Sequence, residues 1–217
     1  MVIERTIAAA THGRFLVVPP ARPGPWPLLV GFHGYAEGAT AQLERLASIP
    51  GIEGWFLVAI QGLHRFYRGR SEDVVASWMT RQDRELAIAD NRAYVAAVVD
   101  EVFREYPVSP TLVFAGFSQG VAMAFRAAAS STRPMAGVIA LGGDVPPDLS
   151  RGELEKVGGV LLGRGDRDDW YTRRIFDNDV RRLVEAGCRV TPIEFKGGHE
   201  WTPAFSAAAK EFLAERP

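Results

Sequence analysis

One serine in this sequence stands where nucleophilic chemistry would require it. Ser118 lies in the run "LVFAGFSQGVAMAF", between Gly116 and Gly120. The apolar and β-branched residues before it predict a strand over 111–117, and the residues after it predict a helix from Gln119. A Gly-x-Ser-x-Gly pattern between a strand and a helix is typical of a nucleophile elbow, a strained turn that lifts the hydroxyl above the end of the sheet. The pattern therefore favours attack by Ser118 on an acyl carbon.

A serine hydroxyl is a weak nucleophile, so such chemistry also requires a base that an acid holds in place. In strand–turn–helix enzymes of this kind the order along the chain is serine, acid, histidine. Of the four histidines, only His199, in "EFKGGHEW", follows Ser118. It falls between the last predicted strand and the last predicted helix, after two glycines that leave the loop room to fold over the serine. We expect His199 to be the general base.

Four aspartates could supply the acid. The segment "GVLLGRGDRDDWY" places Asp166, Asp168 and Asp169 just after the penultimate predicted strand, and Asp144 ends the strand before it. Asp166 comes first after its strand, and we expect it to be the acid. Asp168 or Asp169, and then Asp144, are the alternatives. Aspartates that are not used would cap their loops, a common role for this residue.

The negative charge that develops during acyl transfer needs hydrogen-bond donors aimed at it. The segment "LLVGFHGYAEGA" predicts a strand followed by His33, Gly34 and Tyr35. We expect the Tyr35 backbone N–H to be one donor and the Gln119 N–H, at the start of a helix, to be the other. The side chain of His33 is expected to support this loop and to take no part in proton transfer.

Aromatic residues near the predicted strand ends could form an acyl pocket, although an aromatic beside a sheet is as often part of the core. The candidates are Tyr35, Trp78, Met79, Phe117 and Trp201. No segment between strands is long enough for a large lid, so we expect an open site for short or medium acyl chains. No metal-ligand spacing stands out, and the predicted chemistry needs no cofactor.

The elements that must position these residues are strands alternating with helices. Apolar, β-branched runs such as "LLVGF", "WFLVAI", "TLVFAGF" and "GVLLG" are separated by helical patterns, the clearest over 84–106. This alternation predicts a mainly parallel sheet in three layers. "VIERTI" and "GRFLVVPP" are too close in sequence to hold a helix between them, which predicts an antiparallel N-terminal hairpin at one edge. Pro192 places the last strand at the other edge. Without repeats or linkers, 1–217 is expected to be a single domain.

Composition narrows the possible partners. The net charge is −1, the apolar fraction is 47% and the charged fraction is 24%, which is ordinary for a globular protein and gives no reason to expect nucleic acid or an anionic membrane as a partner. No apolar stretch is long enough for a membrane span. The N-terminus lacks the features of a signal peptide, and the one cysteine, Cys188, cannot form an internal disulfide. We expect a cytoplasmic monomer or homodimer.

The motifs "FHGYAEGA", "SWM", "AGFSQG", "LLGRGDRDD" and "GGHEW" together resemble, in order and spacing, the phospholipase/carboxylesterase family of α/β-hydrolases, which includes acyl-protein thioesterases and small bacterial carboxylesterases. The resemblance runs from about residue 28 to the C-terminus. It implies an α/β-hydrolase fold, a triad of Ser118, Asp166 and His199, and an oxyanion hole formed by Tyr35 and Gln119. It also implies a small-molecule ester or thioester substrate that is cleaved through an acyl-enzyme intermediate.

The sequence departs from the family pattern in places that bear on substrate choice. Val121 stands where the family often has a second glycine after the elbow, and Ala36 and Glu37 replace a common Gly-Asp pair. Met79, after a tryptophan, stands where the family usually has phenylalanine. These changes line the expected acyl groove and leave the triad intact. Two alternative functions remain at this point: an inactive binding protein on a hydrolase scaffold, or a cofactor-free acyltransferase or perhydrolase.

Overall fold

A computed structural model of the protein describes residues 1–216. Within these residues, strands form one mixed sheet in the order β1-β3-β2-β6-β7-β8-β9, with β4 and β5 as a separate antiparallel pair. Every neighbouring pair from β3 to β9 is parallel, and β1 is antiparallel to β3. The strands are β1 (Arg14–Val18), β2 (Trp26–Phe32), β3 (Phe56–Gln61), β4 (His64–Tyr67), β5 (Val74–Ser77), β6 (Val108–Phe117), β7 (Gly137–Leu141), β8 (Gly159–Gly165) and β9 (Arg189–Phe195).

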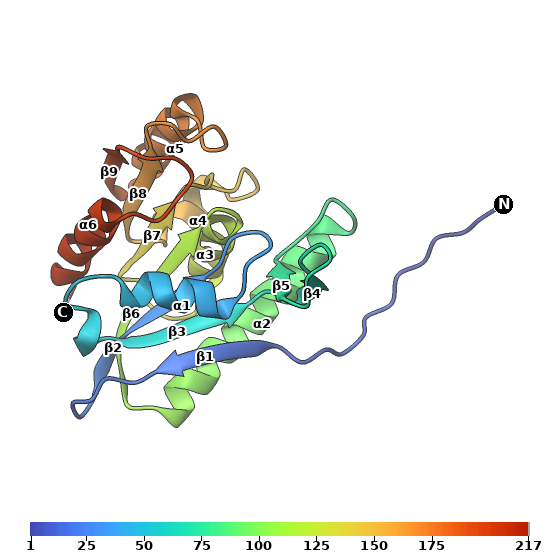
Figure 1. Ribbon diagram of the computed structural model, residues 1–217, viewed down its shortest axis with the longest axis horizontal. Helices are drawn as coiled ribbons and strands as arrows, with labels where there is room; N and C mark the ends of the chain where they lie inside the picture. Colours follow the sequence, from blue (N-terminus) through green and yellow to red (C-terminus); the bar gives the residue numbers. More distant parts are fainter. Residues whose placement is uncertain (217) are drawn as a thin grey trace.

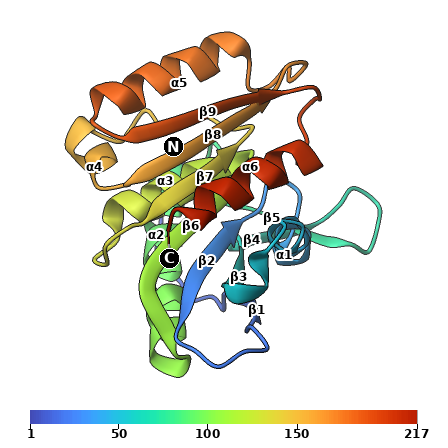
Figure 2. The ribbon, with the colours of Figure 1, turned by 90° about the vertical axis from the view of Figure 1, so that its left-hand side faces the viewer.

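Helices cover both faces of the large sheet, which gives the three layers expected from the sequence. They are α1 (Ala39–Ala47), α2 (Arg84–Glu105), α3 (Gln119–Ser130), α4 (Arg151–Glu155), α5 (Arg173–Glu185) and α6 (Pro203–Ala214), with a short 3-10 helix, η1 (Ile52–Gly54). One buried cluster joins the sheet to α1 and α6, and the other joins it to α2, α3, α4 and α5. Figure 2 shows α6 lying across the sheet on the side away from α3.

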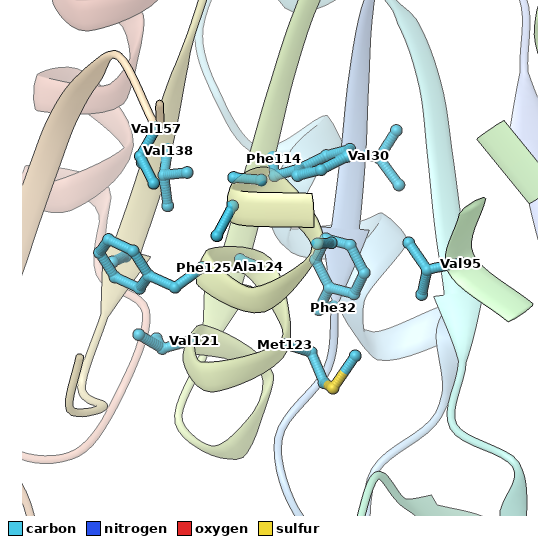
Figure 3. Close-up of a cluster of buried hydrophobic side chains, with 14 of the residues drawn as sticks. Val30, Phe32, Val95, Phe114, Val121, Met123, Ala124, Phe125, Val138 and Val157 are labelled. Carbon is cyan, nitrogen blue, oxygen red and sulfur yellow. The ribbon is translucent and has the colours of Figure 1, made fainter. Parts of the chain in front are cut away.

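Successive side chains of β6 point to opposite faces of the sheet and so contribute to both buried clusters. Phe114 faces the cluster under α3, whereas its neighbours Val113 and Ala115 face the cluster under α6. Figure 3 shows Phe32 and Phe114 of the sheet beside α3, with Phe125 of that helix on the side of β7. Burial of each large apolar side chain contributes about 1.5–3 kcal/mol. The end of β6 is therefore held from both sides, and Ser118 follows it directly.

One edge of the sheet is a parallel strand that contains Pro192, and the other is an antiparallel pair, both as expected. The two strands that form the antiparallel pair are not the predicted ones. Pro192 lies in β9, the edge strand, as predicted. At the other edge the antiparallel pair is β1 with β3, in which Val18 is opposite Leu57. The predicted hairpin between 2–7 and 13–20 is wrong, because residues 1–13 form no strand. Figure 1 shows this N-terminal segment running away from the sheet.

The difference at this edge has a physical reason. Strand β1 completes its hydrogen bonds on the open side of β3, and Phe15 and Val17 are partly buried against the main core. A two-stranded hairpin with Val2 and Ile7, which remain exposed, would be only marginally stable in water. Pairing of β1 with the existing sheet is therefore more stable than the predicted hairpin.

Across residues 1–216, none of the helices combines the length and the apolar character that spanning a bilayer requires.

Candidate active site

Ser118 occupies the turn predicted between a strand and a helix. Strand β6 ends at Phe117 and α3 begins at Gln119, so this single residue makes the corner. Its backbone has φ +52° and ψ −121°, a positive-φ conformation that costs a non-glycine residue of order 1–3 kcal/mol. The Ser118 N–H donates to the Leu141 carbonyl at 2.9 Å, which helps to hold the turn against the end of β7. The neighbouring strand thus helps to hold the strained turn in place.

The two glycines that flank the serine are required by close backbone contacts. A Cβ on Gly116 would lie 2.5 Å from the Gly120 carbonyl oxygen, and a Cβ on Gly120 would lie 2.1 Å from the carbonyl oxygen of Phe32. Backbone atoms cannot move aside as a flexible side chain can. The Gly-x-Ser-x-Gly pattern is therefore a packing requirement at the place where α3 starts against β2 and β6.

His199 connects the serine to a buried carboxylate. Its Nε2 atom lies 2.8 Å from Ser118 Oγ, and its Nδ1 atom lies 2.8 Å from Oδ2 of Asp168. The other carboxylate oxygen of Asp168 accepts the backbone N–H groups of Trp170 and Tyr171, each at 2.9 Å. Asp168 is only 4% exposed. An acceptor fixed at Nδ1 leaves Nε2 free to take a proton from the serine, the arrangement that general-base catalysis needs.

The structure corrects the expected acid: Asp168 holds the imidazole, and Asp166 does not. Strand β8 extends to Gly165, and the Asp166 N–H still donates to Phe195 of β9, so Asp166 continues the ladder. Its carboxylate accepts the Gly197 N–H at 3.0 Å. The chain then turns, with the Asp168 N–H on the Gly165 carbonyl, and this turn brings the later aspartate across to His199.

The other two aspartates that the sequence offered lie elsewhere. Asp169 is exposed, and Asp144 is exposed on the wall of a cavity beside Ser118. Neither contacts the imidazole through a hydrogen bond within the described residues.

The loop after β2 lies directly against the nucleophile. A Cβ on Gly34 would be 3.3 Å from Ser118 Cβ, so the backbone of this loop borders the serine. The Gly34 N–H donates to Glu37 at 2.8 Å, and Arg45 donates to both carboxylate oxygens of Glu37 at 2.6 and 2.5 Å. Ala36 adopts φ +56°, a value that is uncommon for a residue other than glycine. Glu37 and Arg45 therefore fix a loop that contains a strained residue.

The charge state of Glu37 follows from the same contacts. Burial raises the pKa of Glu37, but the hydrogen bonds and charge of Arg45 outweigh burial and leave that pKa below its ordinary value. The guanidinium of Arg45 also lies 4.1 Å from the centre of the Phe117 ring, and this ring lies 5.1 Å from the His199 ring. One ion pair thus supports both the loop and the face of the imidazole.

The two expected oxyanion donors come from different segments, the start of α3 and the loop after β2. Gln119 is the first residue of α3, and its side chain is anchored: Oε1 accepts the Trp78 N–H at 2.9 Å, and Nε2 donates to the Met79 carbonyl at 3.0 Å. Tyr35 lies in the loop after β2, where its side chain is 61% exposed and packs against the Phe66 ring. Gln119 is thus adjacent to the serine, and Tyr35 follows Gly34, whose backbone borders Ser118.

His33 is a structural residue of this loop. It is fully buried, its Nδ1 lies 2.7 Å from the Gly34 carbonyl oxygen, and its Nε2 accepts the Gly62 N–H at 2.9 Å. Burial lowers the pKa of His33, so the imidazole remains neutral and available as an acceptor. Its carbonyl accepts the Trp78 indole N–H at 2.8 Å.

His199 lines two depressions. One is a cavity of about 510 Å³ that Ser118, Gln119 and Met79 help to line, and the other, of about 410 Å³, is lined in part by Phe117 and Trp201. We call the first the serine cavity and the second the outer depression. Met79 thus lies beside the nucleophile, as expected of a pocket residue, whereas Phe117 and Trp201 belong to the outer depression.

The other two pocket candidates differ. Trp78 is fully buried beside the Phe32 and His33 rings, so it belongs to the core, and Tyr35 lines neither of the two depressions. Sequence reasoning missed Trp170, which is 83% exposed on the serine cavity. It also missed Arg81 and Arg84, which lie in the charged run "TRQDRE". The position of Trp170 directly after the aspartate cluster was the available signal.

Comparison with known proteins finds one matching family. The model of the Phospholipase/Carboxylesterase family matches residues 27–216. A comparison with curated proteins finds no matching sequence.

Solved structures share the fold. The carboxylesterase of Bacillus cereus has 15% identity and a TM-score of 0.74 over 94% of this chain and 94% of that one. Esterase PE8 has 21% identity and a TM-score of 0.73 over 95% of this chain and 100% of that one. Acyl-protein thioesterase 2 of Zea mays has 18% identity and a TM-score of 0.73 over 94% of this chain and 99% of that one.

Proposed function

This chain belongs to the phospholipase/carboxylesterase family of α/β-hydrolases, and from that premise we propose that it is a serine hydrolase that cleaves carboxylic esters or thioesters. The observation that carries the proposal is the unbroken line of hydrogen-bonding groups from Ser118 through His199 to Asp168, at 2.8 Å in each step. A buried carboxylate, an imidazole and a hydroxyl in this order are what an acyl-transfer triad requires.

In the proposed reaction Ser118 Oγ attacks the acyl carbon while His199 Nε2 takes its proton. Asp168 keeps Nδ1 of the imidazole occupied and stabilises the imidazolium that forms. The Tyr35 and Gln119 backbone N–H groups would bind the oxygen that becomes negative, where one such donor is worth about 3 kcal/mol. His199 then gives the proton to the leaving alcohol or thiol, and water repeats the sequence to release the acid from Ser118.

The cavity supports short or medium acyl chains. Apolar groups of Met79, Ala122, Ile175 and Trp170 line it. The open mouth suits a small ester that enters from solvent better than a lipid droplet. Thioesters are included because the same attack cleaves them, and because an acyl-protein thioesterase is among the structures that share the fold.

We further propose that 1–217 acts as one catalytic domain without a large lid, in a reducing, cytoplasmic setting. Ser118, Asp168 and His199 follow β6, β8 and β9, which belong to the same seven-stranded sheet. Cys188 is buried and its thiol donates to the Leu154 carbonyl, which suits a reduced cysteine.

The proposal is tested by hydrolysis of p-nitrophenyl esters from two to sixteen carbons, beside acyl-CoA and a lysophospholipid. We expect turnover that is highest for short or medium chains and that falls by about 10⁵-fold or more in Ser118→Ala. Ser130→Ala, in which the lost hydroxyl bonds only to carbonyls of its own helix α3, is the matched control and should keep normal turnover. Absence of hydrolysis across the panel, or full activity in Ser118→Ala, would contradict the proposal.

A further inference from the structure

Two arginines line the serine cavity, and neither guanidinium forms an ion pair with a carboxylate in the part of the chain that the structure describes. Arg81 comes from the loop before α2, Arg84 is the first residue of α2, and both side chains are exposed on the cavity. Neither one makes a hydrogen bond or an ion pair with any residue that the structure describes. By contrast, Arg45 and Arg126 nearby are each held by two hydrogen bonds to a carboxylate.

Asp83 and Glu85 flank Arg84 in the sequence, but both are exposed and neither lines the cavity. Asp148 accepts two hydrogen bonds from Arg126, at 2.9 and 2.6 Å, and these, with a smaller contribution from the charge of Arg84, hold the pKa of Asp148 below its ordinary value. Asp144 also lines the cavity, and its charge adds to burial and to Asp179 in raising the pKa of Tyr171. The donors of Arg81 and Arg84 are therefore left for a ligand.

The outer depression has the opposite charge. Glu37, Glu44 and Glu200 line it together with Arg45, and the carboxylate of Glu37 is the one that Arg45 neutralises. His199 lines both depressions, so the catalytic base lies between a basic cavity and an acidic one. A substrate with charge at one end would therefore bind in one direction.

The chemistry of the proposed triad decides which end lies where. The acyl carbon becomes bonded to Ser118 Oγ, and Ser118 and Gln119 line the serine cavity but not the outer depression. We therefore place the acyl chain in the cavity that carries Arg81 and Arg84, because this cavity also holds the nucleophile and is lined by apolar groups. The leaving group takes its proton from His199 and can depart across the imidazole toward the outer depression.

We propose, on the basis of the hydrolase function above, that the serine cavity selects esters or thioesters whose acyl part ends in a carboxylate, that is, half-esters of dicarboxylic acids. Met79, Ala122 and Ile175 contact the methylene chain, and Arg81 and Arg84 bind the terminal carboxylate. A planar guanidinium matches a carboxylate with two parallel hydrogen bonds. Among the residues that line the cavity, two arginines against one aspartate leave a single excess positive charge, which suits one carboxylate.

The test compares two substrates of equal chain length, the p-nitrophenyl half-ester of adipic acid and p-nitrophenyl hexanoate. The uncatalysed rate of each ester is measured and subtracted. We expect kcat/KM to be about tenfold or more higher for the half-ester at low salt, with the preference reduced as salt screens the charges. The ratio of the two kcat/KM values should fall about tenfold in Arg81→Gln or Arg84→Gln, and further in the double variant.

Controls separate this cavity effect from a general loss of charge. Arg181→Gln removes an exposed arginine of α5 that lines neither depression, and it should leave the ratio unchanged. Arg84→Glu should shift the preference toward the 6-aminohexanoyl ester. A third substrate, the hexanoyl ester of 4-hydroxybenzoate, carries the carboxylate on the leaving group.

Each outcome bears on the proposal. A ratio near one in the wild type, a ratio unchanged in both arginine variants, or a preference for the charge on the leaving group would overturn it while hexanoate turnover still supports a hydrolase. If neither ester is cleaved and Ser118 stays unlabelled by a fluorophosphonate, the hydrolase function itself has failed, and the selectivity proposal falls with it.

Discussion

Oδ2 of Asp168 lies 2.8 Å from Nδ1 of His199, whereas the carboxylate of Asp166, two residues earlier, accepts the Gly197 N–H at 3.0 Å. The two aspartates thus act on the same loop in different ways. Asp168 contacts the imidazole of His199, whereas Asp166 holds the backbone of Gly197, two residues before His199. Their substitutions should therefore separate a loss of chemistry from a loss of loop order.

Asp168→Asn should lower kcat/KM for p-nitrophenyl hexanoate by about 10⁴-fold, because an amide at this position favours the wrong imidazole tautomer. Asp166→Asn should lower it by less than about tenfold, because the amide oxygen can still accept the Gly197 N–H. Steady-state kinetics on both variants makes the comparison. An equal loss in the two, or a larger one in Asp166→Asn, would return the acid role to Asp166.

Gly120→Ala should destabilise the protein, since the new methyl group would meet the Phe32 carbonyl oxygen at 2.1 Å. Forcing an extra methyl into packed backbone typically costs about 1–3 kcal/mol. Gly152→Ala in α4 is the matched control, because a Cβ there meets nothing within 4 Å, and it should gain about 0.5–1 kcal/mol. Urea denaturation of the three proteins measures both changes, and a Gly120→Ala variant as stable as wild type would refute the packing argument.

Glu37→Gln should lower the free energy of unfolding, by an amount that depends on pH, because it removes the ion pair that holds the loop beside Ser118. Since the pKa of folded Glu37 lies below its ordinary value, its stabilising effect is present above the unfolded pKa, about 4.3, and is lost as pH falls through the folded pKa. At pH 7 the variant should lose about 1–3 kcal/mol of unfolding free energy, the cost of a lost charged hydrogen bond.

Unfolding titrations from pH 3 to pH 7 check the sign of this effect. The difference between wild type and Glu37→Gln should shrink as the solution becomes more acidic. Glu44→Gln, on the exposed side of α1, should give a difference close to zero throughout. A Glu37→Gln difference that grows toward low pH would contradict the assignment.

His33 should titrate below the ordinary histidine value of about 6.5, because burial disfavours its charged form. Protonation would also end its role as acceptor for the Gly62 N–H. The stability that neutral His33 contributes is therefore present above about 6.5 and is lost as pH falls through the lowered pKa. Proton NMR of the imidazole signals measures the titration, with His33→Gln to assign the signal. A His33 midpoint above 6.5 would contradict it.

The sequence was most informative where one local pattern fixes the geometry. Ser118 was found because its turn needs a strand before it, a helix after it and no Cβ on either flanking glycine. His199 was found because it alone among the histidines follows the serine. Both arguments use chain order and sterics, which do not depend on distant contacts.

Distant contacts decided the points where the sequence fell short. Whether Asp166 or Asp168 reaches the histidine depends on how the turn after β8 is bonded to β9 and to the loop at Gly197. Trp78 and Met79 are adjacent, yet only Met79 lines the serine cavity, since Trp78 donates to the His33 carbonyl inside the core. The partner of β1 likewise depended on the open side of β3, a strand that is distant in the sequence.

The most direct test of the triad is to treat the protein with a fluorophosphonate and to map the adduct by mass spectrometry. We expect a single adduct on the peptide that contains Ser118, no adduct in Ser118→Ala, and labelling at least about 10³-fold slower in His199→Ala. No adduct on the wild-type protein, or an adduct on a different residue while Ser118 stays free, would contradict the account.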